Sequence, residues 1–101
     1  MKIRVVISDN AKAQLAEQIA YIRDRNPQAA REQKAKISKA VNSLRQSPRL
    51  GKPGRVENTR ELVIYSTPYI LIYELEAACI NILNIYHGST SWTETEEGEE
   101  E

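Results

Sequence analysis

The order of sequence patterns predicts an α+β fold, in which an N-terminal strand precedes a helix hairpin and then a three-stranded antiparallel meander. Two segments carry apolar residues three and four positions apart, which is the spacing of one helical face. A β-branched run precedes them, and three runs rich in isoleucine, leucine and tyrosine follow. The connectors between these three runs have three residues each, which favours antiparallel pairing of the strands. We therefore expect the helix hairpin to pack on one face of the sheet.

The first strand and the first helix are each marked by their residue types. Residues 3–7 are almost all β-branched, which is typical of a short strand with at least one buried face. Ser8 and Asp9 offer two candidates for the N-cap of a helix that we expect over about residues 10–25. The apolar stripe of this helix consists of Leu15, Ile19 and Ile22.

Asn26 and Pro27 mark the boundary between the two helices. Proline cannot continue the first helix, but it fits the first turn of a second one, which Asn26 would cap. The second apolar stripe extends from Ala30 to Leu44, and a serine and a proline follow at positions 47 and 48. We expect the second helix to end near residue 46.

A basic loop and three strands complete the predicted domain. Residues 47–57 contain two prolines, two glycines and three basic side chains, which is the composition of a loop. The strands are expected over residues 60–65, 69–75 and 79–87, where apolar and aromatic residues dominate.

The zero formal net charge of the 101 residues conceals two oppositely charged segments. Residues 1–92 contain all 14 basic residues but only 8 acidic ones, a net charge of +6. Residues 93–101 contain the other 6 acidic residues and no basic one, a net charge of −6. We therefore predict one basic domain over residues 1–92 and an acidic disordered tail over residues 93–101.

Composition excludes several classes of protein. The single cysteine, Cys79, cannot form an internal disulfide, and one histidine cannot assemble a zinc site, so we expect no metal and no other cofactor. The apolar runs are far shorter than the ~20 residues that a membrane span needs. The N-terminus does not have the pattern of a signal peptide. We expect a cytoplasmic protein that does not associate with membranes.

Four motifs in the second half of the chain follow one another in a specific order. They are SPRLGKPGR at residues 47–55, TREL at 59–62, TPYILIY at 67–73 and IYHG at 85–88. In this order they resemble the ParE branch of the ParE/RelE toxin family, the small toxins of bacterial toxin-antitoxin pairs that are also called plasmid stabilisation proteins. The resemblance covers nearly all of residues 2–92, and the predicted order of elements agrees with the fold of this family.

The resemblance implies a toxin that a cognate antitoxin neutralises, and that antitoxin is expected to be a ribbon-helix-helix DNA-binding protein. ParE-like members are described as poisons of DNA gyrase, whereas RelE-like members are ribonucleases that cut mRNA on the ribosome. Our first expectation is ParE-like inhibition of DNA gyrase by a protein that is not an enzyme. The alternatives are a RelE-like mRNA interferase and an inactive homologue that retains antitoxin binding.

A ribonuclease activity would depend on Arg60 and His87. Cleavage of RNA without a metal needs groups that transfer protons and cations that stabilise the charged phosphorane. The resemblance implies an arginine and a tyrosine shortly after His87 in a nuclease, but Ser89 and Trp92 occupy those places. A lone histidine at the end of a strand is more often structural, and Arg60 could equally hold a hairpin. The departure favours a binding protein.

Basic and aromatic residues are the candidates for contacts with the target or the antitoxin. Both faces of the 69–75 strand are largely apolar, and its two tyrosines share one of them. Either helices cover one face and a partner such as the antitoxin covers the other, or the strand has an ordinary, partly exposed aromatic face. Trp92 either anchors the chain end against the helices or contacts gyrase. Basic residues on the helices could also attract DNA directly, but most are expected to be a solvated face. The full set is Arg49, Lys52, Arg55, Arg60, Tyr69, Tyr73, His87 and Trp92.

Overall fold

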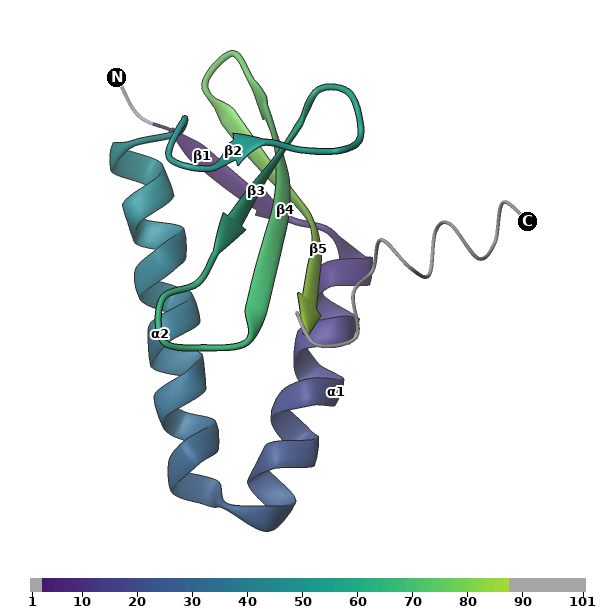
Figure 1. Ribbon diagram of the computed structural model, residues 1–101, viewed down its shortest axis with the longest axis vertical. Helices are drawn as coiled ribbons and strands as arrows, with labels where there is room; N and C mark the ends of the chain where they lie inside the picture. The colour runs from purple at the N-terminus through teal and green to yellow at the C-terminus, as the bar shows by residue number, and fades with distance from the viewer. Residues whose placement is uncertain (1–2, 88–101) are drawn as a thin grey trace, which may run out of the picture.

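The computed structural model describes residues 3–87, which form a five-stranded mixed sheet and a helix hairpin (Figure 1). The elements are β1 (Arg4–Ile7), α1 (Asp9–Arg25), α2 (Pro27–Gln46), β2 (Lys52–Pro53), β3 (Thr59–Val63), β4 (Tyr69–Glu76) and β5 (Cys79–His87). The strand order is β1-β5-β4-β3-β2, with β1 parallel to β5 and each other neighbouring pair antiparallel. The predicted α+β fold is confirmed.

Polar side chains set the helix boundaries, as the sequence indicates. Ser8 caps α1, since its hydroxyl oxygen accepts a hydrogen bond from the Ala11 N–H at 3.0 Å. Asn26 caps α2 through the Ala29 N–H at 3.1 Å, and Pro27 begins that helix. The first of the two candidate caps before α1 is therefore the one that is used.

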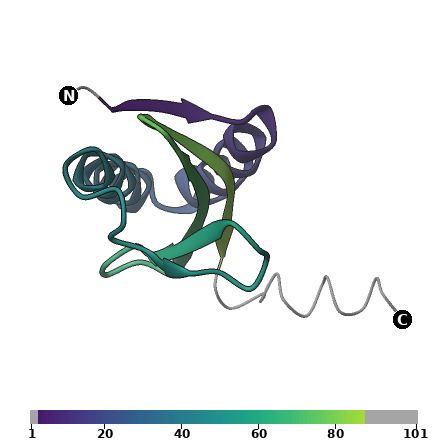
Figure 2. The same ribbon diagram turned by 90° about the horizontal axis from the view of Figure 1, so that it is seen from above.

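The hydrophobic core lies between the helix hairpin and one face of a strongly twisted sheet (Figure 2). Its buried members come mainly from both helices and from the two longest strands, and they include Ala11, Ile37, Leu44, Leu71, Tyr73, Ile80, Ile82 and Ile85. Polar contacts also fasten α1 to β5. Gln18 Nε2 donates to the Ile85 carbonyl at 3.1 Å, and the Ile85 N–H donates to Gln14 Oε1 at 3.0 Å.

The basic loop contains one strand that the sequence does not reveal. Lys52–Pro53 form β2, which pairs with Glu61 and Arg60 of β3. The Gly54 N–H donates to the Thr59 carbonyl at 2.8 Å and closes this hairpin. A two-residue strand that contains proline has no alternating pattern by which it could be recognised. The predicted three-stranded meander therefore gains a fourth antiparallel strand.

β3 is shorter than the sequence suggests. It covers Thr59–Val63, whereas the pattern predicts a strand over residues 60–65. The Ile64 N–H donates to the Tyr69 carbonyl at 3.0 Å and starts a turn, so Tyr65 leaves the sheet and is 90% exposed. An aromatic residue at the end of a β-branched run is not by itself evidence that the strand continues.

Two further predictions concern membrane association and the C-terminal tail. Within residues 3–87, neither helix is both long enough and apolar enough to cross a membrane. Trp92 and the predicted acidic tail over residues 93–101 lie outside the described residues.

Candidate binding surface at the loop end of the sheet

Residues 47–51 form a loop that a buried tyrosine holds against the sheet. The Tyr73 hydroxyl donates to the Pro48 carbonyl at 2.7 Å and accepts from the Gly51 N–H at 2.9 Å. Its ring is 0% exposed. A buried phenol that uses both hydrogen-bonding capacities fixes the position of the chain segments that it joins. Tyr73 is therefore a positioning residue for the loop.

Arg60 holds the same loop from β3. One nitrogen of its guanidinium, Nη1, donates to the Gly51 carbonyl at 2.6 Å and approaches the Arg49 carbonyl at 3.4 Å. Bonds from a charged donor are roughly twice as strong as neutral ones. This contact agrees with the interpretation of Arg60 as a residue that holds the hairpin.

Gly51 is required by the close approach of the loop to Tyr73. A Cβ atom at this position would lie 2.8 Å from Tyr73 Cε1, 2.9 Å from its hydroxyl oxygen and 3.0 Å from the Glu61 carbonyl oxygen. These distances are below ordinary van der Waals contact. The glycine of the SPRLG motif therefore serves packing, because only a residue without a side chain fits between β3 and the tyrosine ring.

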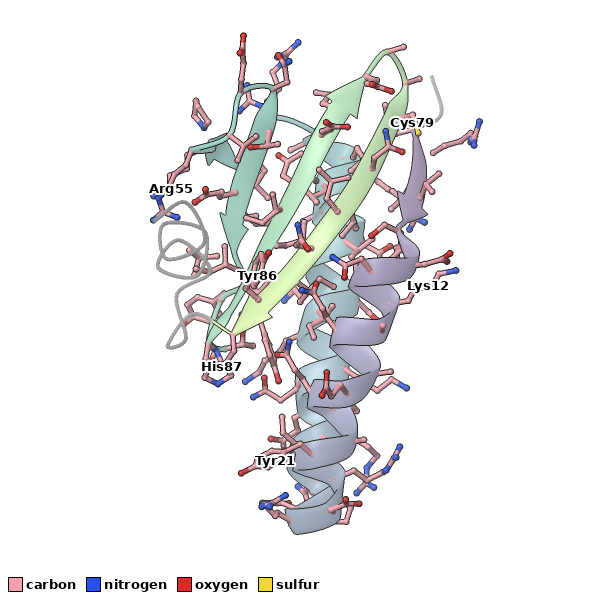
Figure 3. All side chains as sticks on the ribbon, turned by 90° about the vertical axis from the view of Figure 1, so that its right-hand side faces the viewer. Lys12, Tyr21, Arg55, Cys79, Tyr86 and His87 are labelled. Carbon is pink, nitrogen blue, oxygen red and sulfur yellow. The ribbon has the colours of Figure 1, made fainter. Side chains whose placement is uncertain are left out.

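The neighbouring segment, residues 54–58, is fastened by a buried carboxylate. Glu61 is 6% exposed, and its Oε2 accepts from the Arg55 N–H at 3.2 Å and lies 3.9 Å from Arg55 Nη1. The Arg55 side chain itself is 56% exposed (Figure 3). Sequence reasoning missed Glu61. The alternation of TREL places Glu61 on the same strand face as Thr59, but it does not show that this face is buried.

A cavity of about 650 Å³ opens beside these loops, and its charged lining is mixed in sign. Arg49 and Arg60 contribute positive charge, while Glu74 and Glu76 of β4 contribute negative charge. The two carboxylates oppose the binding of a polyanion at this point. We call this end of the sheet, with the exposed cations Arg49, Lys52 and Arg55, the loop-end surface.

Tyr69 and Tyr73 do not form the aromatic surface that the sequence suggests. Both rings are 0% exposed, because the face that they share with Leu71 is the one that packs against the helices. The helices therefore cover the face that carries the tyrosines, and the partly exposed aromatic face is wrong. Burial raises the pKa of both tyrosines, and for Tyr73 the Gly51 N–H and the charge of Arg60 act in the opposite direction.

His87 lies at the other end of the sheet from Arg60. His87 pairs with Tyr69 across β4, whereas Arg60 pairs with Tyr73. At about 3.3 Å per residue, these two positions on β4 are about 13 Å apart, and the two residues flank opposite edges of that strand. The His87 ring meets the edge of Tyr69 with a centroid separation of 5.8 Å. Arg60 and His87 are not neighbours.

The outer face of the sheet carries an apolar row that was not among the predicted contact residues. Val63, Ile70 and Tyr86 pair in register across β3, β4 and β5. They point away from the core, because Leu71, next to Ile70, points into it. Val63 is 61% exposed, and Figure 3 shows Tyr86 on the sheet near the end of β5. A surface of this kind suits a protein partner.

Within the described part of the chain, no three histidine, cysteine or acidic side chains are grouped to hold a metal ion. The chemistry of the loop-end surface is therefore that of cations, carboxylates and peptide groups. Of the eight predicted residues, the structure brings together Arg49, Lys52, Arg55 and Arg60, places Tyr73 beneath them, and separates Tyr69 and His87 from them.

The chain has a fold of the ParE/YoeB type. It superposes on a structure titled "Chromosomal ParDE TA system from P. aeruginosa" with a TM-score of 0.76 and 22% identity, over 84% of this chain and 95% of that one. It is also similar to the YoeB dimer of Staphylococcus aureus and to a YoeB/ParE toxin from Agrobacterium tumefaciens. Both have a TM-score of 0.55. The YoeB dimer is 16% identical, and the alignment covers 86% of this chain and 99% of that one. The YoeB/ParE toxin is 9% identical, and the alignment covers 84% of this chain and 98% of that one.

The sequence then identifies the family. Residues 5–92 match the family described as "ParE toxin of type II toxin-antitoxin system, parDE". The chain is also 40% identical over 73 residues to Y4kP of Sinorhizobium fredii (strain NBRC 101917 / NGR234), which is described as a candidate toxin; the match covers 72% of this chain and 75% of Y4kP. The chain belongs to the ParE toxin family of type II toxin-antitoxin systems, and membership implies a cognate ParD antitoxin as its partner.

Proposed function

We propose that the chain is a toxin that inhibits DNA gyrase by binding to it, without catalysing a reaction. The separation of Arg60 and His87 is the observation that carries this proposal. A ribonuclease would need both near one phosphate, but they flank opposite edges of β4 about 13 Å apart along it. Arg60 is also engaged with the carbonyls of residues 49 and 51.

The loop-end surface supplies the features that a binding protein needs. Arg49, Lys52 and Arg55 are exposed, while Tyr73 and Arg60 hold the backbone beneath them. A surface that is fixed before association loses less conformational entropy when it binds. The net charge of +6 over residues 1–92 also favours association with a complex of gyrase and DNA.

A supercoiling assay with purified gyrase tests the proposal. The purified chain should inhibit supercoiling at micromolar concentration and accumulate the cleaved DNA complex. Lys52→Glu should weaken the inhibition, whereas Lys12→Glu, the same change at an exposed position of α1, should alter it less. If the wild-type chain neither inhibits supercoiling nor traps cleaved DNA, gyrase is not its target.

The ribonuclease alternative gives a different result in a translation assay. A RelE-like toxin would stop protein synthesis and leave cut mRNA on ribosomes, and Arg60→Ala and His87→Ala would each restore translation. We expect translation to continue in the presence of the wild-type chain. Harmless expression without the antitoxin, together with retained antitoxin binding, would instead indicate an inactive homologue.

A further inference from the structure

A groove of about 480 Å³ lies between α2 and the end of β3. Lys36, Lys39 and Ala40 of α2 line one side, and Leu50 and residues 62–66 line the other. Figure 1 shows the turn after β3 approaching α2, where Lys36 Nζ donates to the Ser66 carbonyl at 3.2 Å. We call it the edge groove.

The backbone of β3 is open on the side of the edge groove. β2 pairs only with Arg60 and Glu61, so Val63 has β4 on one side and no strand on the other within the described part of the chain. The Ile64 N–H donates to the Tyr69 carbonyl of the turn, and hydrogen bonds alternate in direction along an antiparallel strand. The Val63 N–H and C=O therefore point away from β4. An edge of this kind can accept an added strand.

The side chains of the edge groove combine apolar surface with positive charge. Val63 is 61% exposed, and Leu50 and Tyr65 are exposed as well. Lys36 and Lys39 add two positive charges, no carboxylate between residues 3 and 87 lines the groove, and neither lysine forms an ion pair there. α2 as a whole carries five basic side chains and one acidic one. The groove thus suits an extended ligand with an apolar anchor and several carboxylates.

We propose that the C-terminal segment of the same chain, residues 92–101, binds in the edge groove. Trp92 supplies a large apolar side chain for Val63 and Leu50. The six glutamates that follow it supply carboxylates for Lys36 and Lys39, and the net charge of −6 over residues 93–101 is opposite in sign to that of α2. The segment enters from the end where β3 turns into β4, so it runs antiparallel to β3.

The place where β5 ends brings the segment within reach of the edge groove. His87 pairs with Tyr69, and the Tyr69 carbonyl accepts from the N–H of Ile64, which lines the groove. Neighbouring strands are about 4.8 Å apart, so His87 lies about 10 Å from Ile64. The five residues from His87 to Trp92 span up to about 17 Å when extended. Trp92 can therefore reach the groove without any movement of the sheet.

The segment is favoured over a separate partner because it is part of the chain. A tethered ligand has an effective concentration on the order of millimolar, which a separate protein in the cell rarely reaches. When it is bound, it covers the open edge of β3 and neutralises Lys36 and Lys39. It thereby competes with any partner that would add a strand to β3 or present acidic groups to α2. This inference concerns the free chain and does not depend on gyrase as the target.

The fluorescence of Trp92 tests the inference, because Trp92 is the only tryptophan of the chain. Acrylamide should quench it much less in the folded full-length chain than in the chain unfolded in urea. Val63→Asn removes apolar contact and should lower the ratio of bound to free Trp92 by about tenfold, so quenching should rise. Val6→Asn, the same change at an exposed valine of β1, is the control and should leave quenching unchanged.

A charge reversal on α2 tests the role of the glutamates at a position that is exposed and does not support the core. Lys39→Glu should lower the same ratio by about threefold at low salt. Lys12→Glu, the matched change on α1, should have no such effect (Figure 3). At about 1 M NaCl, where the screening length is about 3 Å, the two variants should behave alike.

Amide signals in ¹⁵N-labelled protein locate the contact. Deletion of residues 93–101, or Trp92→Ala, should shift the signals of Lys36, Lys39 and Val63 and leave those of Val6 and Lys12 in place. If acrylamide reaches Trp92 equally in the folded and unfolded chains, or if the shifted signals lie elsewhere, the segment does not bind the edge groove. If quenching in the wild type falls as the protein concentration rises, the segment binds a second copy and the intramolecular proposal is wrong.

Discussion

Two tyrosines of β4, four residues apart, share the same strand face and the same burial but differ in their hydrogen bonds. Tyr73, at the loop end, donates to the Pro48 carbonyl and accepts from the Gly51 N–H. Tyr69, the first residue of β4, has no hydrogen-bond partner for its hydroxyl among the described residues. The Tyr73 hydroxyl thus uses both of its hydrogen-bonding capacities, whereas the Tyr69 hydroxyl uses neither within the described part of the chain. The difference indicates that hydrogen bonds fix the surroundings of Tyr73 more firmly than those of Tyr69.

The largest expected effect is at Gly51, where the loop that Tyr73 holds is most tightly packed. Gly51→Ala would place a Cβ atom 2.8 Å from the Tyr73 ring, so the ring or the loop must move. We expect a loss of about 2–3 kcal/mol in the free energy of unfolding, in the range of overpacked cores. Urea denaturation measures it, with the exposed neighbour Lys52→Ala as the control. A loss no larger than that of Lys52→Ala would show that the loop end is not rigid.

Tyr73→Phe and Tyr69→Phe remove the same atom from two positions on the strand. Tyr73→Phe leaves the Gly51 N–H without its partner and should cost about 1–3 kcal/mol. Tyr69→Phe removes an unpaired hydroxyl, so the free energy of unfolding should be unchanged or higher. Tyr65→Phe, at a side chain that is 90% exposed, sets the baseline in the same thermal melts. Equal losses at Tyr69 and Tyr73 would remove the contrast between the two tyrosines.

Arg60→Met should have a smaller effect on the loop end. The methionine keeps an apolar stem but loses the donor to the Gly51 and Arg49 carbonyls. We expect a loss of about 1 kcal/mol, together with faster hydrogen exchange at residues 49–51. Arg49→Met, which changes an exposed side chain, is the matched control. Unchanged exchange in Arg60→Met would mean that Tyr73 alone holds the loop.

Alkaline pH should produce the smallest effect and should involve both tyrosines. Burial raises the pKa of Tyr69 and of Tyr73 above the ordinary value of 10.0, so the native state holds these protons more tightly than the unfolded chain does. Their contribution is therefore complete below about pH 10 and is lost as pH rises through the native pKa values. Denaturation midpoints measured from pH 8 upwards should fall above pH 10. Tyr69→Phe should reduce this fall, and Tyr65→Phe should not.

The sequence predicts the bounds of the helices much better than it predicts burial or hydrogen-bond partners in the sheet. The apolar stripes and the capping residues predict the bounds of both helices almost to the residue, since Ser8, Asn26 and Pro27 are specific signals for where the helices begin. The alternation of residues 69–75 correctly places Tyr69 and Tyr73 on one face. It cannot indicate that this face meets the helices, or that only one tyrosine finds partners, because those partners come from a loop 22 to 25 residues earlier in the chain.

The arrangement of the candidate site could likewise be predicted only in part from the sequence. The cluster of Arg49, Lys52, Arg55 and Arg60 could be predicted, because a loop and a strand that are adjacent in sequence bring these residues together. The separation of Arg60 from His87 could not, since it depends on the register of β3 and β5 against β4. Glu61 was missed because a carboxylate between an arginine and a leucine resembles an ordinary surface residue until its burial is known.

The parallel pairing of β1 with β5 also constrains when the protein can fold. Arg4–Ile7 lie beside residues 79–82, and the Ser8 hydroxyl donates to the Leu83 carbonyl, 75 positions later in the chain. During synthesis the N-terminal strand and the polar side of α1 have no partner until the last strand has left the ribosome. The sheet therefore closes in one late step, with long-range contacts that are slow to form. A nascent chain that stops before β5 would lack the strand against which both β1 and α1 pack.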